Sequence, residues 1–177
     1  VDAEHYIVSP DKYCITFQGD PKAEYRACVG STGWSTGKHY WRVWSGTDNA
    51  RIGICTGDCT PDKPGGSDEH SWCLNMQTGD VYHNFDPAKP AEGITKRLYK
   101  FLCPIGGGRV SFLLDMDDGK LLLFMNDEYQ GVMVSDLKGK GPFYPCIGIG
   151  GTEGKSIYIL PEPTPVPKMY TYKRNKI

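Results

Sequence analysis

The sequence predicts an all-β fold, an antiparallel β-sandwich. Many short segments alternate apolar and polar residues with a period of two, which is the pattern of half-buried strands. Glycine and proline make up 35 of the 177 residues (22 Gly and 13 Pro) and separate these segments. No window of a dozen residues repeats apolar side chains convincingly at helical spacing. Short strands at this spacing indicate a sandwich or a barrel, and the antiparallel hairpins favour a sandwich.

Two segments in the first half of the chain have strand character. Residues 39–44 are rich in aromatic and branched side chains, which strands favour. Residues 71–84 are expected to form a hairpin that turns at 78–80. Residues 57–70 and 85–108 lack strand patterning. Loops of that length in a compact domain are usually functional or mobile, so both are candidate functional loops.

The second half of the chain contains the clearest alternation. Val110, Phe112 and Leu114 share one face of an expected strand. Asp-Gly at 118–119 and Asn-Asp at 126–127 then supply tight turns between antiparallel neighbours. The strands expected here are residues 110–116, 121–125, 129–134 and 156–160.

The composition changes after Leu160, which divides the chain into a domain at 1–161 and a tail at 162–177. Prolines alternate from Pro161 to Pro167, so this part is expected to be extended and to leave the sheet. They are two apart and give no P-x-x-P register. Basic residues and tyrosines follow. Such a tail either binds nucleic acid or anionic lipid or stays solvated with one tyrosine packed. We favour the second, because four charges alone bind weakly at physiological salt.

Composition and charge exclude several functions. The net charge is −1, whereas a surface that binds phosphate backbones needs a basic excess. No apolar run approaches the ~18 residues that a membrane span requires. We therefore expect no nucleic-acid partner and no membrane partner. The chain begins at Val1 without a signal-peptide pattern, so we expect a piece of a longer protein, whose oligomerisation, if any, depends on other domains.

Seven cysteines are spread along the chain, at positions 14, 28, 55, 59, 73, 103 and 146. An odd number in a domain of this size does not match a disulfide framework, and no Asn-x-Ser/Thr sequon occurs. We therefore expect reduced thiols and a cytoplasmic location. Cys55, Cys59, His70 and Cys73 together offer ligands that zinc accepts. Their spacing fits no common zinc finger, so we expect no metal, with Cys55 and Cys73 in strands and His70 in a loop.

No catalytic motif is complete in this sequence. Residues 33–37 match G-x-S-x-G, the turn that presents a nucleophilic serine in hydrolases. That motif works between a strand and a helix, but strand-like residues follow Ser35. Residues 106–108 lack the Lys-Ser/Thr of a phosphate loop, and the acids at 115–118 lack the closing Glu of a calcium loop. We expect no catalytic residue and no cofactor, and a hydrolase hypothesis depends on Ser35 alone.

Five segments follow one another in a recognisable order. The first is Cys-Val-Gly-Ser-Thr-Gly-Trp-Ser-Thr-Gly-Lys-His-Tyr-Trp-Arg-Val at 28–43. The others are Arg-Ile-Gly-Ile-Cys at 51–55, the Trp-containing hairpin at 71–83, Arg-Val-Ser-Phe-Leu-Leu-Asp with its return strand at 109–126, and Phe-Tyr-Pro at 143–145. Together they resemble the SPRY (B30.2) family over about residues 5–160, with 1–29 as a PRY-like segment.

The chain also departs from the family pattern at three places. Arg42 and Ser111 replace an acid and a glycine that are usual in the family. Residues 8–11 replace the Leu-Asp-Pro of the PRY segment. These departures leave open whether the domain is PRY-SPRY or SPRY alone.

The resemblance implies a bent antiparallel β-sandwich of the SPRY/B30.2-like type, a concanavalin-like jelly roll. It also implies a protein–protein interaction module without enzymatic activity, which binds a protein or peptide through loops at one end of the sandwich. Such modules serve as target-recognition parts of ubiquitin ligases of the tripartite-motif or SOCS-box type, of innate immune sensors and of intracellular channels.

The resemblance also implies a set of partner-binding positions. They are Arg51, Asn75, Gln77, Ile149, Gly150, Gly151 and Thr152, bordered by Asp48, Asn49, Asp68, Glu69 and His70. Amides and a guanidinium favour a polar peptide held by hydrogen bonds. We therefore expect Arg51→Ala with Gln77→Ala to weaken binding at an unchanged melting temperature.

Two alternatives stay open. In the first, these positions have no binding role: Asn75 and Gln77 are only solvated strand residues, and Arg51 covers apolar surface with the aliphatic part of its side chain. In the other, the sandwich binds a small molecule or a glycan. Glycan sites usually need an exposed aromatic platform, and Trp44 is the one candidate for it.

Overall fold

The computed structural model describes residues 5–19, 26–86, 88–89, 94–97, 108–151 and 154–160. The expected tail at 162–177, Thr152 and Cys103 lie outside the described residues. The described part contains strands and no helix, which confirms the predicted all-β class. The strands are β1 (Tyr6–Val8), β2 (Cys14–Phe17), β3 (Cys28–Val29), β4 (Lys38–Ser45), β5 (Ala50–Thr56), β6 (Ser71–Asn75), β7 (Asp80–Tyr82), β8 (Ile94–Arg97), β9 (Gly108–Asp115), β10 (Lys120–Met125), β11 (Glu128–Val134), β12 (Phe143–Ile149) and β13 (Ser156–Leu160).

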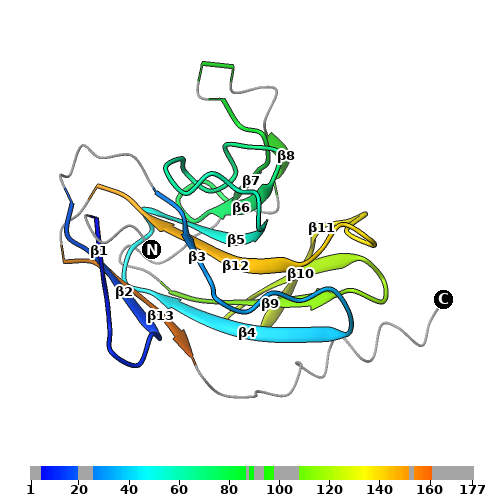
Figure 1. The fold of residues 1–177 in the computed structure, drawn as a ribbon, viewed down its shortest axis with the longest axis horizontal. Helices are drawn as coiled ribbons and strands as arrows, with labels where there is room; N and C mark the ends of the chain where they lie inside the picture. The colour runs from blue at the N-terminus through cyan, green and yellow to red at the C-terminus, as the bar shows by residue number, and fades with distance from the viewer. Residues whose placement is uncertain are drawn as a thin grey trace.

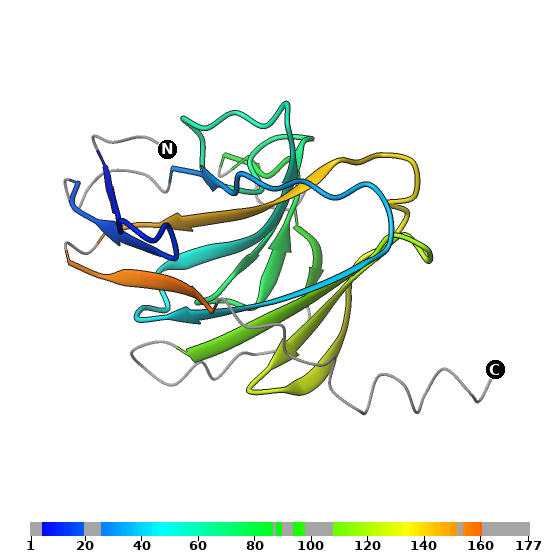
Figure 2. The ribbon, with the colours of Figure 1, turned by 60° about the horizontal axis from the view of Figure 1, so that its bottom comes forward.

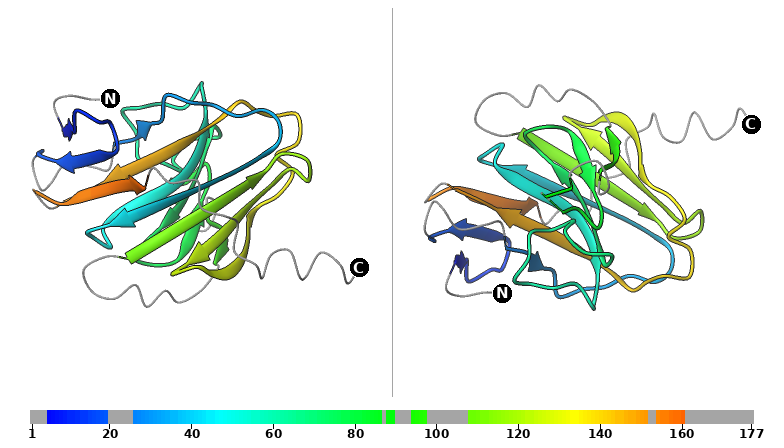
Figure 3. Two further views of the ribbon diagram at one scale, coloured as in Figure 1. Left: turned by 90° about the horizontal axis from the view of Figure 1, so that it is seen from below. Right: turned by 90° about the horizontal axis from the view of Figure 1, so that it is seen from above.

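The strands form two antiparallel sheets that pack as the two layers of a sandwich (Figures 1 and 2). The seven-stranded sheet has the order β1-β2-β13-β4-β9-β10-β11, and the six-stranded sheet has the order β3-β12-β5-β6-β7-β8. Spatial neighbours are often distant in sequence. β4, for example, lies between β13 and β9, as the view from below shows (Figure 3, left). The antiparallel sandwich predicted from the sequence is confirmed.

Alternation along the strands places the main core between the two sheets. Val110, Phe112 and Leu114 of β9 are fully buried in this core, as the period-two pattern predicts. Ile52 and Ile54 of β5, in the opposite sheet, belong to the same cluster. Burying one such side chain stabilises the fold by about 1.5–3 kcal/mol relative to leaving it exposed. The shared cluster therefore holds the two layers together.

Turn chemistry sets the register of the hairpins in the second half of the chain. Met125 pairs with Glu128 across β10 and β11, and Asn126 and Asp127 between them have φ values of 47° and 69°. A two-residue turn with positive φ matches the twist of the strands, and Asn and Asp tolerate this conformation better than most side chains. Residues 116–119 turn β9 into β10. Both hairpins predicted here are confirmed.

Five strands were not predicted: β1, β2, β3, β8 and β12. β8 lies within the stretch 85–108, so the expectation that this stretch lacks strands is wrong. β1 and β2 form a hairpin in which Tyr6 pairs with Phe17. β1, β2, β3 and β8 are two to four residues long, which is too short for a period-two pattern to be recognised. β12 has seven residues, but it is an almost continuous apolar run interrupted by Pro145 and does not alternate.

The G-x-S-x-G segment is an exposed turn before β4. Ser35 is exposed, and residues 35–37 form a bend after which β4 begins. Because a strand follows, the strand–turn–helix arrangement of a nucleophile elbow is not formed in this described segment. His39 stacks on Trp34 with ring centroids 4.7 Å apart, and its Nε2 lies 2.7 Å from Thr36 O. His39 is therefore a hydrogen-bonded residue near the start of β4.

Candidate binding surface

Loops at one end of three neighbouring strands bring most of the predicted site residues together. Ala50 at the start of β5 pairs with Ile149 at the end of β12, and Arg51 pairs with Asn75 at the end of β6. The β4–β5 loop, the residues after β12 and the β6–β7 turn therefore meet at one end of the six-stranded sheet, where the β12 arrow ends in Figure 1. We call five residues of these loops the rim: Asp48, Asn49, Gln77, Gly150 and Gly151.

Hydrogen bonds tie two of the rim loops together. Asn49 Nδ2 donates to Gly150 O at 2.5 Å, and Gly150 N donates to Asn49 O at 3.1 Å. The hydroxyl of Tyr6 in β1 accepts from Ile149 N at 3.1 Å and lies 2.7 Å from Arg26 O. The rim therefore rests on a fixed frame. The sequence pattern gives no signal for the role of Tyr6, because β1 is too short to be recognised.

The β4–β5 loop is shaped by its own polar side chains. Ser45 Oγ donates to Thr47 O at 2.6 Å, and Thr47 Oγ1 accepts from Asn49 N at 3.0 Å. Ser45 and Thr47 are buried, whereas Asp48 and Asn49 are half-buried. Ser45 and Thr47 were not among the candidate residues. Their signal is the Ser-x-Thr-x-Asn pattern, since such side chains form local hydrogen bonds in turns.

Arg51 is buried behind the rim. It is 9% exposed, and its guanidinium carbon lies 4.7 Å from the ring centroid of Tyr82 and 5.6 Å from that of Phe85. These two rings stack on each other with centroids 4.0 Å apart. Its Nη1 donates to Gly65 O at 3.3 Å and to Ser67 Oγ at 3.4 Å. Arg51 therefore joins the loop before β6 to the six-stranded sheet.

Asn75 is buried beside Arg51 and shapes the turn that carries Gln77. Its Oδ1 accepts from Gln77 N at 2.9 Å and from Thr78 N at 3.4 Å, and its Nδ2 donates to Tyr82 Oη at 3.2 Å. Gln77 itself is exposed. Of these two amides, Gln77 is the one that solvent reaches freely.

Asp68, Glu69 and His70 lie at the other end of β5 and β6. His70 O accepts from Thr56 N, the last residue of β5, at 2.8 Å. Because β5 and β6 are antiparallel, residues that precede β6 lie beside the end of β5, and the rim lies beside its start. The structure does not bring these three residues to the rim. Glu69 and His70 instead line a separate open cavity of about 540 Å³ with Trp72.

Asp68 anchors the loop before β6. Its Oδ1 accepts from His70 N at 3.0 Å and from Ser71 Oγ at 2.7 Å, and its Oδ2 accepts from Thr60 N at 2.9 Å. Burial raises the pKa of Asp68, but these hydrogen bonds to the carboxylate outweigh burial, so the pKa lies below its usual value. The ionised side chain therefore stabilises this loop.

Four cysteines pack in a small cluster on the six-stranded sheet. They are Cys55, Cys59, Cys73 and Cys146. The hydrogen bond with Cys146, together with burial, raises the pKa of the Cys55 thiol. His70 does not belong to this cluster, and its Nε2 lies 3.8 Å from Glu69 Oε1. Within the described ranges, no group of three or more His, Cys, Asp or Glu side chains could hold a metal ion.

Trp44 lies on the outer face of the seven-stranded sheet. The sequence alone did not predict which face of its strand carries this side chain. It pairs with Tyr158 of β13, and the two ring centroids are 5.6 Å apart. Trp44 is 44% exposed and Tyr158 is 42% exposed. Two neighbouring exposed rings form a small aromatic platform.

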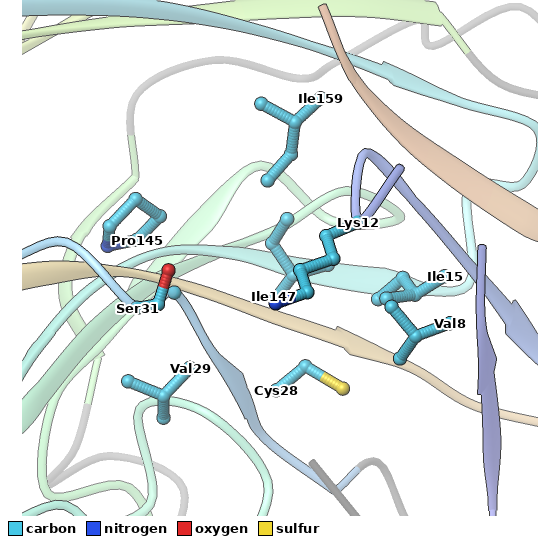
Figure 4. Close-up of a pocket in the computed structure, with 10 residues that line it drawn as sticks. Val8, Lys12, Ile15, Cys28, Val29, Ser31, Pro145, Ile147 and Ile159 are labelled. Carbon is cyan, nitrogen blue, oxygen red and sulfur yellow. The ribbon is translucent and has the colours of Figure 1, made fainter. Parts of the chain in front are cut away.

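An apolar cavity of about 350 Å³ opens beside the β1–β2 hairpin (Figure 4). It is lined by Val8, Lys12, Ile15, Cys28, Val29, Gly30, Ser31, Pro145, Ile147 and Ile159. Lys12 is the one charged side chain among these lining residues. None of the predicted site residues lines this cavity. Because most of its lining side chains are apolar, the cavity could hold an apolar group.

A family model described as "SPRY domain" matches residues 38–161 of the chain. Protein gustavus of Drosophila melanogaster is 30% identical over 181 residues, covering 91% of this chain and 62% of that protein. F-box/SPRY domain-containing protein 1 of Culex quinquefasciatus is 31% identical over 170 residues, covering 90% and 63%. SPRY domain-containing SOCS box protein 1 of Homo sapiens is 29% identical over 188 residues, covering 96% and 66%. The chain thus spans a little over three fifths of the length of these relatives.

Solved structures with low sequence identity share the fold. The TRIM65 PSpry domain matches with a TM-score of 0.68 at 18% identity, covering 90% of this chain and 87% of that one. The SPRY domain of human HERC1 matches with a TM-score of 0.70 at 19% identity, covering 92% and 96%. In the described part of the chain, no helix is long and apolar enough to cross a membrane.

Proposed function

The chain belongs to the SPRY domain family, and from this membership we propose that it is a non-catalytic module that binds a protein or peptide through the rim. The observation that carries the proposal is the convergence of three loops at one end of the six-stranded sheet. Binding residues often lie on loops that a rigid scaffold positions. The frame of Tyr6, Asn49 and the end of β12 supplies that rigidity.

The chemistry of the rim supports a polar ligand. Gln77 is exposed, and Asp48 and Asn49 are half-buried, so a side-chain amide and a carboxylate are accessible beside Gly150 and Gly151. Gly150 is buried and Gly151 is half-buried, so Gly151 is the glycine that lets a ligand backbone approach closely. A peptide held by hydrogen bonds to these groups fits the surface better than one anchored by an aromatic side chain, because the rim contains no aromatic residue.

The wider role that we propose is target recognition within a larger ubiquitin ligase in the cytoplasm. Two relatives are named for a SPRY domain together with an F-box or a SOCS box. By analogy, we propose that this chain binds the target protein and that other parts of the same ligase modify it. In this proposal the SPRY domain supplies binding, and catalysis lies elsewhere.

Selection from a peptide library displayed on phage tests the proposal. The full chain is the bait, and the dissociation constant of an enriched peptide is measured by titration calorimetry. Asp48→Ala with Gln77→Ala is expected to weaken binding by at least about tenfold, since a few residues carry most of an interface's energy. Glu69→Ala, an exposed change at the other end of β5 and β6, is the matched control and is expected to leave the affinity unchanged.

Two results would contradict this assignment. One is a library from which no peptide is enriched. The other is an affinity that Glu69→Ala weakens and the rim variant does not, which would move the binding site to the cavity beside Trp72. Melting temperatures of both variants, measured in parallel, separate loss of binding from loss of folding.

The platform of Trp44 and Tyr158 favours a second candidate function, glycan binding. Sugar rings stack on exposed aromatic faces, and these two side chains are exposed next to each other. A glycan array probed with the full chain tests this candidate. A hit that Trp44→Ala abolishes supports glycan binding, and an array without hits removes it.

A further inference from the structure

A second apolar cluster lies on the outer face of the seven-stranded sheet, the sheet at the front in Figure 3, left. Leu113, Leu122 and Phe124 are 0%, 2% and 0% exposed, and Tyr40 and Tyr129 pack against them. Because side chains alternate along β9 and β10, these residues face away from the main core. We call these five residues the outer cluster. The six-stranded sheet lies on the opposite side and does not cover it.

A row of paired residues runs across this face from the end of β13. Leu160, the last residue of β13, pairs with Arg42 of β4. From there the pairing continues through Ser111 of β9 and Phe124 of β10 to Tyr129 of β11. The row crosses four strand spacings, which is about 19 Å at ~4.8 Å for each spacing. β13 therefore ends at one end of the row that carries the outer cluster.

Two buried hydroxyl groups lie on the same face. Tyr40 Oη and Ser111 Oγ are buried and have no hydrogen-bond partner among the described residues. Ser111 lies in the row described above, two strands away from Leu160. A buried hydroxyl without an acceptor costs free energy. The segment that covers this face is therefore expected to supply acceptors close to the end of β13.

The sequence that follows β13 has the matching chemistry. Pro161, Pro163, Pro165 and Pro167 alternate, and proline offers a carbonyl acceptor but no N–H donor. Proline-rich segments adopt the extended polyproline II conformation. The prolines lack the P-x-x-P register, so we expect their rings to pack directly on aromatic side chains rather than in an SH3-type groove. At ~3.1 Å for each residue, residues 161–167 span about 22 Å, close to the width of the row.

We propose that residues 161–167 dock in the polyproline II conformation across the outer face of the seven-stranded sheet and cover the outer cluster. The aromatic groups that receive them are Tyr40, Phe124 and Tyr129. The ring centroids of Tyr40 and Phe124 are 5.9 Å apart, and those of Phe124 and Tyr129 are 5.6 Å apart, so the three rings form a continuous surface. The site is thus an intramolecular docking site on the sheet.

Photo-crosslinking in the full chain tests the path. A benzoylphenylalanine side chain is introduced at Glu162 in one sample and at Val166 in another, and crosslinked peptides are identified by mass spectrometry. The label at 162 is expected to react within β4 or β9, and the label at 166 within β10 or β11, because the second lies farther along the row. Tyr129→Ala, a change at a half-buried position, is expected to remove the crosslink from 166 only.

Hydrogen exchange in the full chain gives a second, independent measurement. Pro163→Gly with Pro165→Gly is expected to speed amide exchange in residues 120–134 by about tenfold, because a flexible segment covers the cluster less of the time. Lys173→Ser with Arg174→Ser is the control and is expected to leave that exchange unchanged. Crosslinks only between two chains would show that a second copy covers the cluster. That result, or unchanged exchange in the proline variant, would overturn the proposal.

Discussion

Buried polar side chains beside the rim determine its shape, and their exposed neighbours are available to a partner. Arg51 and Asn75 pair across β5 and β6 and are both buried, whereas Gln77 is exposed only two residues beyond Asn75. Sequence reasoning placed all three in one binding set because motif position does not reveal burial. The structure separates the residues that support the rim from those that solvent reaches.

Arg51→Ala is expected to lower the free energy of unfolding by about 2 kcal/mol, because it removes the contact with the Tyr82 ring and the hydrogen bonds to Gly65 and Ser67. Gln77→Ala is expected to change it by less than about 0.5 kcal/mol. Urea denaturation of both variants measures the difference. This replaces the sequence-based expectation of an unchanged melting temperature. Equal unfolding midpoints for Arg51→Ala and the unmodified chain would show that these contacts contribute nothing.

Asp68→Asn is expected to destabilise the fold at neutral pH by about 1 kcal/mol, because the amide replaces a carboxylate that accepts three hydrogen bonds. The folded-state pKa of Asp68 is lowered, so the stability that ionisation contributes is present above the unfolded-state pKa of about 3.9. It is lost as the pH falls through the folded-state value. Denaturation curves at pH 7 and at about pH 3 should therefore show the gap between Asp68→Asn and the unmodified chain closing in acid. A gap that stays constant would rule out this role for the charge.

At the scale of elements, length and alternation decided which strands could be predicted, and the seven-residue β12 was missed because its apolar run does not alternate. β9, with eight residues, alternates long enough to be recognised, and the Asn-Asp turn after β10 fixes the next hairpin. β1, β2 and β8 were not predicted, because a segment of three or four residues is too short to show a period-two pattern. Pairing with neighbouring strands, which pattern analysis does not see, makes these segments strands.

Gly53 shows how tightly the six-stranded sheet is packed. A Cβ at this position would lie 1.9 Å from Trp72 O and 2.9 Å from Cys73 Cα, both backbone atoms of the adjacent β6. Gly53→Ala is therefore expected to cost about 3 kcal/mol, which lowers the melting temperature by about 10 °C in a chain of this size. Gly57→Ala, where the nearest atom is 3.9 Å away, is the matched control and should change little. Calorimetry that finds equal melting temperatures for the two variants would refute the clash.

At the scale of the whole molecule, the fold class could be predicted from the alternation and the family resemblance. The site could be predicted only in part. The order of the motifs placed the rim loops correctly. It also assigned residues 68–70 to the same surface, but these residues lie at the other end of β5 from the rim. Tyr6 and Thr47 support the rim through hydrogen bonds that join distant segments or fold back within a loop. Such contacts depend on the three-dimensional arrangement and leave only a weak trace in sequence.

A chemical-shift map of the ¹⁵N-labelled chain, titrated with a peptide selected from the library, tests most directly whether the rim is the binding surface. We expect the largest amide shifts at Asn49, Gln77 and Gly150, with Trp44 and Tyr158 unaffected. The account would be contradicted if the rim amides did not shift and the largest shifts were centred on Trp44 and Tyr158 or on the cavity of Figure 4.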